Sequence, residues 1–211
     1  METRVKICGI TNLADAQAAV AAGADALGLN FYERSPRHIT LKNAAEISKQ
    51  LPSFVMRAGV FVNADEDLVT RAIAECSLSL LQFHGDESPE FCTQFGLISM
   101  KAFRIRDVES LKELPKYQTD AYLLDAFSPE ARGGTGEKFN WDLAIEAQKF
   151  GKPIFLAGGL TPENVADVVK KVRPFGVDVA SGVESSPGKK DHAKIRAFIA
   201  AVRKADGQEK S

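Results

Sequence analysis

Short apolar or β-branched segments alternate with longer alanine- and charge-rich segments along all 211 residues, and no other feature constrains the fold as strongly. Runs of the first kind predict strands, and segments of helical period predict helices. We expect strands at residues 5–10, 26–31, 56–62, 80–83, 98–103, 121–125, 153–157 and 176–180. Eight strand–helix units in strict order fit a closed barrel or a doubly wound sheet. We favour closure, as a single-domain α/β (β/α)8 TIM barrel.

Capping residues mark the helices between these strands. Asn12 and Thr161 suit N-caps, Pro162 suits a first helical position, and Gly23 suits a helix end. We expect helices over residues 12–23, 42–51, 65–76, 89–96 and 108–114, from 141, from 161, and over 190–204. Because no linker or low-complexity tract separates two halves, residues 1–211 indicate one domain. The polar tail at 206–211 is expected to fray.

Charge and cysteine content narrow the class of partner. Twenty-seven basic and 28 acidic residues nearly cancel, so no global field favours nucleic acid or an anionic membrane. Cys8, Cys76 and Cys92 are odd in number and unrelated in spacing, which argues against a disulfide framework and a clustered zinc site. We expect a small-molecule ligand, no nucleic-acid partner and a monomer rather than an obligate oligomer.

Hydropathy predicts neither a secreted nor a membrane protein. The start METRVKICGI lacks the apolar core of a signal peptide, and no run approaches the roughly 20 apolar residues that span a bilayer. We therefore expect a cytoplasmic location and no membrane partner.

Reactive groups in such a barrel lie at the carboxyl ends of the strands. These positions hold Cys8, Asn30, His84, Arg104, Asp125, Gly158 to Gly159 and Ser181 to Gly182. Period-two alternation places Lys6 and Cys8 on one face of the first strand, and Val5 and Ile7 on the face suited to the helix layer. Cys8 is then expected at the barrel mouth.

Cys8 and Asp125 are the candidate base and acid. A Cys8 thiolate can remove a carbon-bound proton if nearby cations or helix termini lower its pKa. Asp125 ends the apolar strand YLLD, where partial desolvation favours the protonated acid. The alternatives are that Cys8 is a small buried hydrophobe and that Asp125 caps the following loop. For Cys76 and Cys92, packing within helices is the preferred explanation.

Two glycine-bearing turns follow the last two strands. AGGLTPEN holds Gly158 and Gly159, and ASGVE holds Ser181 and Gly182. Backbone N–H groups in such turns approach phosphate closely, and this is the usual phosphate position in these barrels. Either turn alone also fits an ordinary tight turn, but the two together indicate a phosphorylated ligand.

Three further side chains are candidates for ligand contact. Arg34, in the loop ERSPRH, can form a bidentate pair with a carboxylate. His84 and Asp178 are possible substrate-orienting groups, and for each a structural hydrogen bond is an equal alternative.

The motifs KICGI, FYERSPRHI, FVN, LQFHGDE, LLDAF, GGTGEKFNW, LAGGLTPENV and GVDVASGVE occur in this order over nearly the whole chain. In this set the chain resembles the phosphoribosylanthranilate isomerase family. KICGIT, GGLTPEN and SGVE are the most diagnostic because they combine the base position with both phosphate turns.

The resemblance implies an Amadori rearrangement in tryptophan biosynthesis, from N-(5-phosphoribosyl)anthranilate to 1-(2-carboxyphenylamino)-1-deoxyribulose 5-phosphate. It implies no cofactor and no metal, with Cys8 as general base, Asp125 as general acid and Arg34 as ligand of the anthranilate carboxylate. The rivals are another ribulose-phosphate barrel enzyme, such as indole-glycerol-phosphate synthase or an epimerase, and a non-catalytic phosphosugar-binding protein. The synthase would be expected to present lysine and glutamate at its strand ends.

Overall fold

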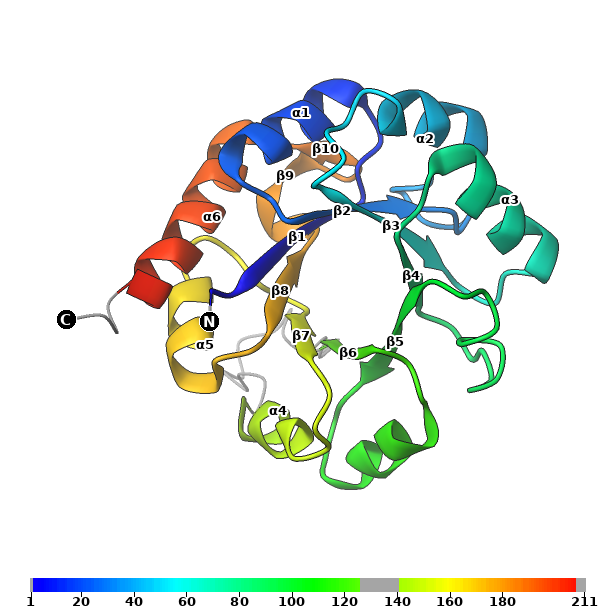
Figure 1. Ribbon diagram of the computed structural model, residues 1–211. Helices are drawn as coiled ribbons and strands as arrows, with labels where there is room; N and C mark the ends of the chain where they lie inside the picture. The colour runs from blue at the N-terminus through cyan, green and yellow to red at the C-terminus, as the bar shows by residue number, and fades with distance from the viewer. Residues whose placement is uncertain (1, 126–140, 208–211) are drawn as a thin grey trace.

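Eight parallel strands close into a barrel in which each strand is hydrogen-bonded to its neighbours in chain order (Figure 1). The computed structural model describes residues 2–125 and 141–207. The strands are β1 (Arg4–Cys8), β2 (Ala26–Asn30), β3 (Met56–Phe61), β4 (Leu80–Phe83), β5 (Ile98–Arg104), β6 (Ala121–Asp125), β7 (Ile154–Ala157) and β8 (Gly176–Val179). β1 pairs with β2 and with β8, so the ring closes. The expected barrel is confirmed.

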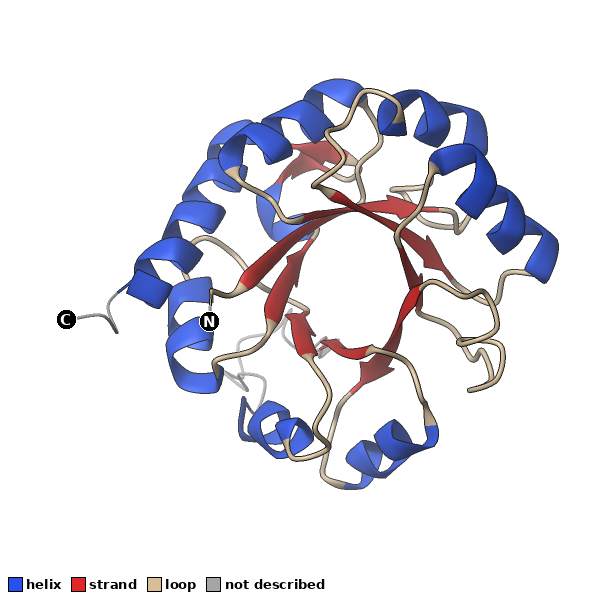
Figure 2. Cartoon of the chain, viewed as in Figure 1, coloured by secondary structure: helices blue, strands red, loops and turns tan. Residues whose placement is uncertain are grey.

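Helices surround this ring (Figure 2). They are α1 (Leu13–Ala22), α2 (Leu41–Ser48), α3 (Glu66–Cys76), α4 (Trp141–Gln148), α5 (Val165–Val172) and α6 (His192–Gly207), with the 3-10 helix η1 (Glu109–Lys116) between β5 and β6. A 3-10 turn, η3 (Ser181–Val183), and a hairpin of β9 (Glu184–Ser186) and β10 (Lys189–Lys190) follow β8. This hairpin lies between the last strand of the barrel and the last helix.

The ends of α1 follow the capping chemistry expected from the sequence. The Asn12 side chain accepts a hydrogen bond from the Asp15 N–H at 2.9 Å. It thereby gives an acceptor to one of the first backbone N–H groups, which have none within the helix. Gly23 ends the helix with φ at 96°, in the left-handed region that glycine adopts without strain.

Alternation along the strands divides the apolar residues into two cores. Val5 and Ile7 of β1 belong to the outer core between barrel and helices. The inner core lies inside the barrel and consists of Ala58, Leu80, Met100, Ala102, Ala121, Leu123, Phe155 and Ala157. The inward positions of β1 and β8 hold polar groups instead, since Lys6 and Asp178 bond to each other. The expected facing of β1 is therefore confirmed.

The helix expected at residues 89–96 was wrong. The segment forms consecutive turns. The Thr93 hydroxyl competes for the backbone by donating to the Pro89 and Glu90 carbonyls. Phe91 and Phe95 pack on Phe83, with ring centroids 5.7 and 6.0 Å away, and anchor the segment without a regular helix.

Two other helix boundaries differ from expectation. The segment after Asp107 is a 3-10 helix, since Ser110 donates from its backbone N–H to the Asp107 carboxylate and from its hydroxyl to the Asp107 carbonyl. α5 begins at Val165 rather than directly after Thr161, so Thr161 does not cap it. Asn164 instead joins the preceding turn, accepting from the Thr161 N–H at 2.8 Å and donating to the Gly159 carbonyl at 2.9 Å.

The start of the tail expected to fray at 206–211 is also ordered differently. Asp206 and Gly207 belong to α6, and the Asp206 carboxylate accepts from both the backbone N–H and the hydroxyl of Thr3, at 2.9 and 2.7 Å. This tie fixes the end of the last helix beside the start of β1. Residues 208–211 lie outside the described part of the chain.

Candidate active site

The carboxyl ends of the strands bring the candidate base and acid to one end of the barrel. Cys8 is the last residue of β1 and Asp125 the last of β6. Residues two apart in a strand point to the same face. Lys6 on β1 and Leu123 on β6 face the barrel interior, so Cys8 and Asp125, each two residues further along, face inward as well. β7 and β8 separate these strands around the ring, so the two side chains enter the mouth from different sides.

Cys8 is buried beside charged groups of the barrel interior. Gly28, its partner in β2, gives it room, because a Cβ there would lie only 2.7 Å from the Cys8 sulfur and 3.1 Å from the Lys6 ammonium. Burial raises the pKa of Cys8 above its ordinary value, and the negative charge of Asp178 adds to this. Lys6 and Lys190 act in the opposite direction but do not outweigh burial. The lowered pKa that was the condition for a thiolate base is therefore not found here.

Lys6 and Asp178 form an ion pair inside the barrel, with Lys6 Nζ 2.9 Å from Asp178 Oδ1. Burial alone would lower the pKa of Lys6, but Asp178 and Cys8 outweigh it, so the pKa lies above its usual value and the ammonium stays charged. Of the two interpretations of Asp178, the buried hydrogen bond is present. Contact with a substrate hydroxyl stays a prediction.

A second charged cluster links the loop after β2 to the hairpin after β8. The Arg37 guanidinium donates from Nε and Nη2 to the two carboxylate oxygens of Glu184, at 2.8 and 2.7 Å. Lys190 Nζ donates to the same carboxylate at 2.9 Å. Burial would raise the pKa of Glu184, but these hydrogen bonds outweigh it and hold the pKa below the usual range. Glu184 is thus an ionised hub between two cations.

The loop after β2 places its two arginines differently. The Arg37 side chain packs against Gly9, the residue after Cys8, so closely that a Cβ on Gly9 would overlap its Cδ. Arg37 and Cys8 also interact electrostatically. Arg34 is exposed on the loop surface. The structure therefore brings Arg37, rather than Arg34, beside the candidate base.

His84 follows β4 and lies between Gln82 of the barrel interior and Asp125 at the mouth. Its Nδ1 lies 3.1 Å from Nε2 of Gln82, and its Nε2 lies 3.5 Å from Oδ2 of Asp125. Asn30 is engaged within its own loop, where its side chain bonds Ser35 and the Tyr32 N–H.

The two glycine-bearing turns lie against each other. A Cβ on Gly182 would overlap the carbonyl oxygen of Leu160, so the turn after β8 packs directly on the loop after β7. Gly158 and Gly159 have φ values of 87° and 64°, a conformation that side chains rarely adopt. Gly159 and Ser181 are exposed to solvent. The two turns therefore form one continuous backbone surface.

Sequence reasoning missed Lys6, Arg37, Glu184 and Lys190. A signal for Lys6 was present, because a lysine that alternates in register with Cys8 faces the interior and requires a buried partner. Glu184 and Lys190 gave no comparable signal, since their hairpin is too short to show strand periodicity.

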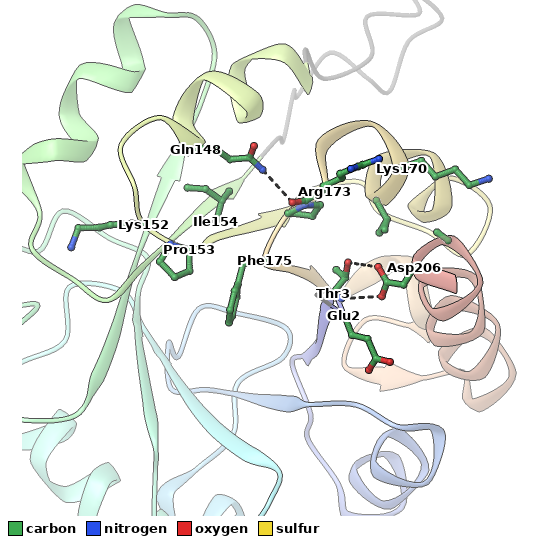
Figure 3. A pocket seen from close by; sticks show the side chains of 13 residues that line it. Glu2, Thr3, Gln148, Lys152, Pro153, Ile154, Lys170, Arg173, Phe175 and Asp206 are labelled. Carbon is green, nitrogen blue, oxygen red and sulfur yellow. Dashed lines mark hydrogen bonds between the residues drawn. The ribbon is translucent and has the colours of Figure 1, made fainter. Parts of the chain in front are cut away.

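A cavity of about 360 Å³ lies at the opposite end of the barrel (Figure 3). Thr3, Pro153 and Phe175, which immediately precede β1, β7 and β8, line it together with Lys152 and Arg173. Amino-terminal ends of strands in such barrels serve stability, whereas the chemistry lies at the other end. We therefore place the active site away from this cavity.

Two features are absent from residues 2–125 and 141–207. No group of three or more His, Cys, Asp or Glu residues there is arranged to hold a metal ion. No helix in these ranges is long and apolar enough to cross a membrane. The motif GGTGEKFNW, apart from Trp141, lies outside the described residues.

Comparisons with known proteins point to one family. Residues 5–201 match the model of a family described as N-(5'-phosphoribosyl)anthranilate isomerase. The N-(5'-phosphoribosyl)anthranilate isomerase of Geotalea uraniireducens is 55% identical over 197 residues, which cover 93% of this chain and 97% of the relative. That of Geobacter sulfurreducens is 53% identical over 204 residues, covering 97% and 98%.

Solved structures give the same result. The phosphoribosyl anthranilate isomerase of Thermotoga maritima superposes with a TM-score of 0.90 at 42% identity, covering 96% of this chain and 99% of that one. A phosphoribosyl anthranilate isomerase in complex with reduced 1-(o-carboxyphenylamino)-1-deoxyribulose 5-phosphate has a TM-score of 0.87 at 39% identity, with the same coverage.

Removing Lys6 should destabilise the protein strongly. Lys6→Met leaves Asp178 as an uncompensated buried charge, so the free energy of unfolding should fall by about 3–5 kcal/mol. Adding Asp178→Leu removes that charge and should restore most of the loss. Urea denaturation followed by fluorescence of the single tryptophan, Trp141, measures both variants. Equal stability of Lys6→Met and the wild type would contradict the buried ion pair.

The Cys8 thiol should react slowly at neutral pH. Burial raises the pKa of Cys76 to about 11 and that of Cys92 to about 12. In a Cys76→Ala/Cys92→Ala background, alkylation of Cys8 by iodoacetamide should speed up about tenfold per pH unit, because the thiolate is the reactive form. The rate should still rise beyond pH of about 8. A plateau below that pH would mean that the free thiol has a lowered pKa.

Proposed function

The chain belongs to the N-(5'-phosphoribosyl)anthranilate isomerase family, and from this premise we propose which residue performs each step. It is an aldose-ketose isomerase of tryptophan biosynthesis, an intramolecular oxidoreductase. It converts N-(5-phosphoribosyl)anthranilate to 1-(2-carboxyphenylamino)-1-deoxyribulose 5-phosphate by an Amadori rearrangement. The assignment of residues depends on one observation: a thiol and a carboxyl group end two inward-facing strands at the same mouth.

Asp125 acts as the general acid of ring opening. Its side chain is about one fifth exposed at the end of an apolar strand, so it reaches a bound sugar while remaining largely shielded from water. It donates its proton to the ribose ring oxygen, the ring carbon–oxygen bond breaks, and the bond to the anthranilate nitrogen becomes an iminium. The cation that forms acidifies the hydrogen on the adjacent sugar carbon.

Cys8 acts as the general base that takes this proton. Burial opposes thiolate formation in the free protein, but the substrate iminium brings a positive charge to the site and favours the thiolate. Lys6 and Lys190 act in the same direction from the protein side. Loss of the carbon-bound proton gives an enolamine, whose tautomerisation yields the ketone. A modest base is sufficient because the iminium has already activated the carbon.

The substrate phosphate binds where the turns after β7 and β8 meet. Gly158, Gly159, Ser181 and Gly182 provide the backbone N–H groups and the hydroxyl suited to its oxygens. Two observations support this placement: the two turns pack against each other, and Gly159 and Ser181 are exposed to solvent.

We assign the anthranilate carboxylate to Arg37 and retain Arg34 as the alternative. Arg37 lies beside Gly9 and is oriented by a bidentate pair with Glu184. That pair uses Nε and Nη2, so Nη1 can donate to the substrate carboxylate. Anchoring the ligand at its phosphate and its carboxylate orients the sugar between Cys8 and Asp125. His84, from the mouth, and Asp178, from the barrel interior, are proposed to orient the substrate.

We further propose that residues 1–211 act as one domain, as a cytoplasmic monomer whose partner is the phosphorylated substrate. The proposed acid, base and anchors all come from one chain, so one copy suffices for turnover. Sedimentation velocity measures the oligomeric state.

Loss of either proton-transfer group should reduce turnover while leaving the fold intact. Cys8→Ala and Asp125→Asn should each lower kcat by a factor on the order of 10² or more. Consumption of phosphoribosylanthranilate, followed by its fluorescence, measures the effect, and circular dichroism checks the fold. Near-normal turnover in one variant removes that residue from its role. Binding without turnover in the wild type would instead support the phosphosugar-binding alternative.

The two arginine variants should separate the two candidate anchors. Arg37→Ala should raise KM about tenfold or more, because a bidentate carboxylate partner is lost. Arg34→Ala is the matched control from the same loop and should leave KM within about twofold. The reverse pattern would return the carboxylate to Arg34. Unchanged KM in both variants would exclude this loop as the anchor.

A further inference from the structure

Three polar side chains form a line in space from the barrel interior to the mouth: Gln82, His84 and Asp125. The Gln82 amide nitrogen is 3.1 Å from His84 Nδ1, and His84 Nε2 is 3.5 Å from Asp125 Oδ2. Gln82 is only 1% exposed, whereas the side chains of His84 and Asp125 are 25% and 20% exposed. The line is therefore buried at Gln82 and partly exposed at His84 and Asp125.

Gln82 is an unusual residue at this depth. It points inward with Leu80 on β4, and the neighbouring interior positions on β3 and β5 to β7 are apolar. Its Oε1 is buried and has no hydrogen-bond partner among the described residues. A buried polar atom left unsatisfied destabilises the folded protein. An apolar side chain of the same length would avoid that cost, so packing alone does not account for the amide.

The hydrogen bond of Gln82 determines where the neutral imidazole carries its proton. The side-chain amide nitrogen of Gln82 can only donate a hydrogen bond, so Nδ1 of His84 accepts it. The imidazole proton is then on Nε2, the nitrogen that faces Asp125. A hydrogen bond from this N–H to Oδ2 would restrain rotation of the carboxyl group about its Cβ–Cγ bond. The 3.5 Å separation is long, but such contacts shorten when a ligand closes the site.

We propose that Gln82 is a positioning residue for the ring-opening step. Its amide selects the Nε2–H tautomer of His84, and His84 in turn holds the Asp125 carboxyl in the orientation from which it protonates the ring oxygen. This inference rests on the proposed role of Asp125 as the acid. It assigns Gln82 no contact with the substrate and accounts for a buried amide that weakens the inner core.

Nitrogen-15 NMR of the histidine rings tests the tautomer directly. The chain has three histidines, His38, His84 and His192, and the His84→Ala variant identifies the signals of His84. At pH of about 8.5, where an ordinary imidazole is neutral, wild-type His84 should show a protonated Nε2 and an unprotonated Nδ1. Gln82→Met should remove this preference, and Gln82→Glu should move the proton to Nδ1, because a carboxylate only accepts. A protonated Nδ1 in the wild type would overturn the proposal.

Kinetics test whether the tautomer matters for turnover. Gln82→Met should lower kcat about tenfold with KM nearly unchanged, because it misaligns the acid without removing a substrate contact. It should be at least as stable as the wild type, which a merely structural role would not predict. Gln148→Met is the matched control, since it deletes another side-chain amide that donates at 2.8 Å, to the Val172 carbonyl, at the far end of the barrel. Its kcat should not change.

A double variant shows whether Gln82 acts through His84. In a His84→Ala background, Gln82→Met should cause no further loss of kcat, because the intermediary is already gone. A kcat within about twofold of wild type in the single variant, or an equal additional loss in the double variant, would overturn the inference. Turnover retained by Asp125→Asn would instead remove the acid assignment itself, so the two failures are distinguishable.

Discussion

Closure of the barrel is the constraint on which the rest of the molecule depends. Once β1 pairs with β8, every second side chain of each strand must enter an interior that is sealed around the ring. Apolar residues fill most of these positions. Where a charge enters, as at Lys6, it requires a partner from a neighbouring strand, and Asp178 supplies it in direct register. The same pairing places an ammonium next to the thiol two residues along β1.

The sequence predicted the architecture well because the strands carry a strong period-two pattern. It also predicted the start of α1, where Asn12 caps the helix through a local contact. It failed where tertiary contacts outweigh local propensity. The segment with Phe91 and Phe95 carries a helix-like start signal at Pro89, but its aromatic rings pack on Phe83 in a form that the local sequence does not encode.

Site prediction had the same limits. Cys8 and Asp125 were predicted as site residues because both end strands, and topology alone puts strand ends at the mouth. Which arginine of the loop after β2 lies beside Gly9 depends on Glu184, which lies 147 positions from Arg37 in the chain. No period within the loop distinguishes Arg34 from Arg37. The state of the Cys8 thiol was also beyond the sequence, because burial and three charged neighbours from different segments act on it together.

The contacts around β1 join segments that are far apart in the chain. Asp206 bonds Thr3 across 203 positions, Lys190 bonds Asp15 across 175, and Asp178 bonds Lys6 across 172. During synthesis the ribosome releases the first βα unit long before the strand and hairpin that complete its surroundings. The nascent chain therefore carries a lysine destined for burial that has no counter-ion until the final quarter emerges. Contacts of such long range make folding slow, and catalytic competence is expected to arise late and all at once rather than unit by unit.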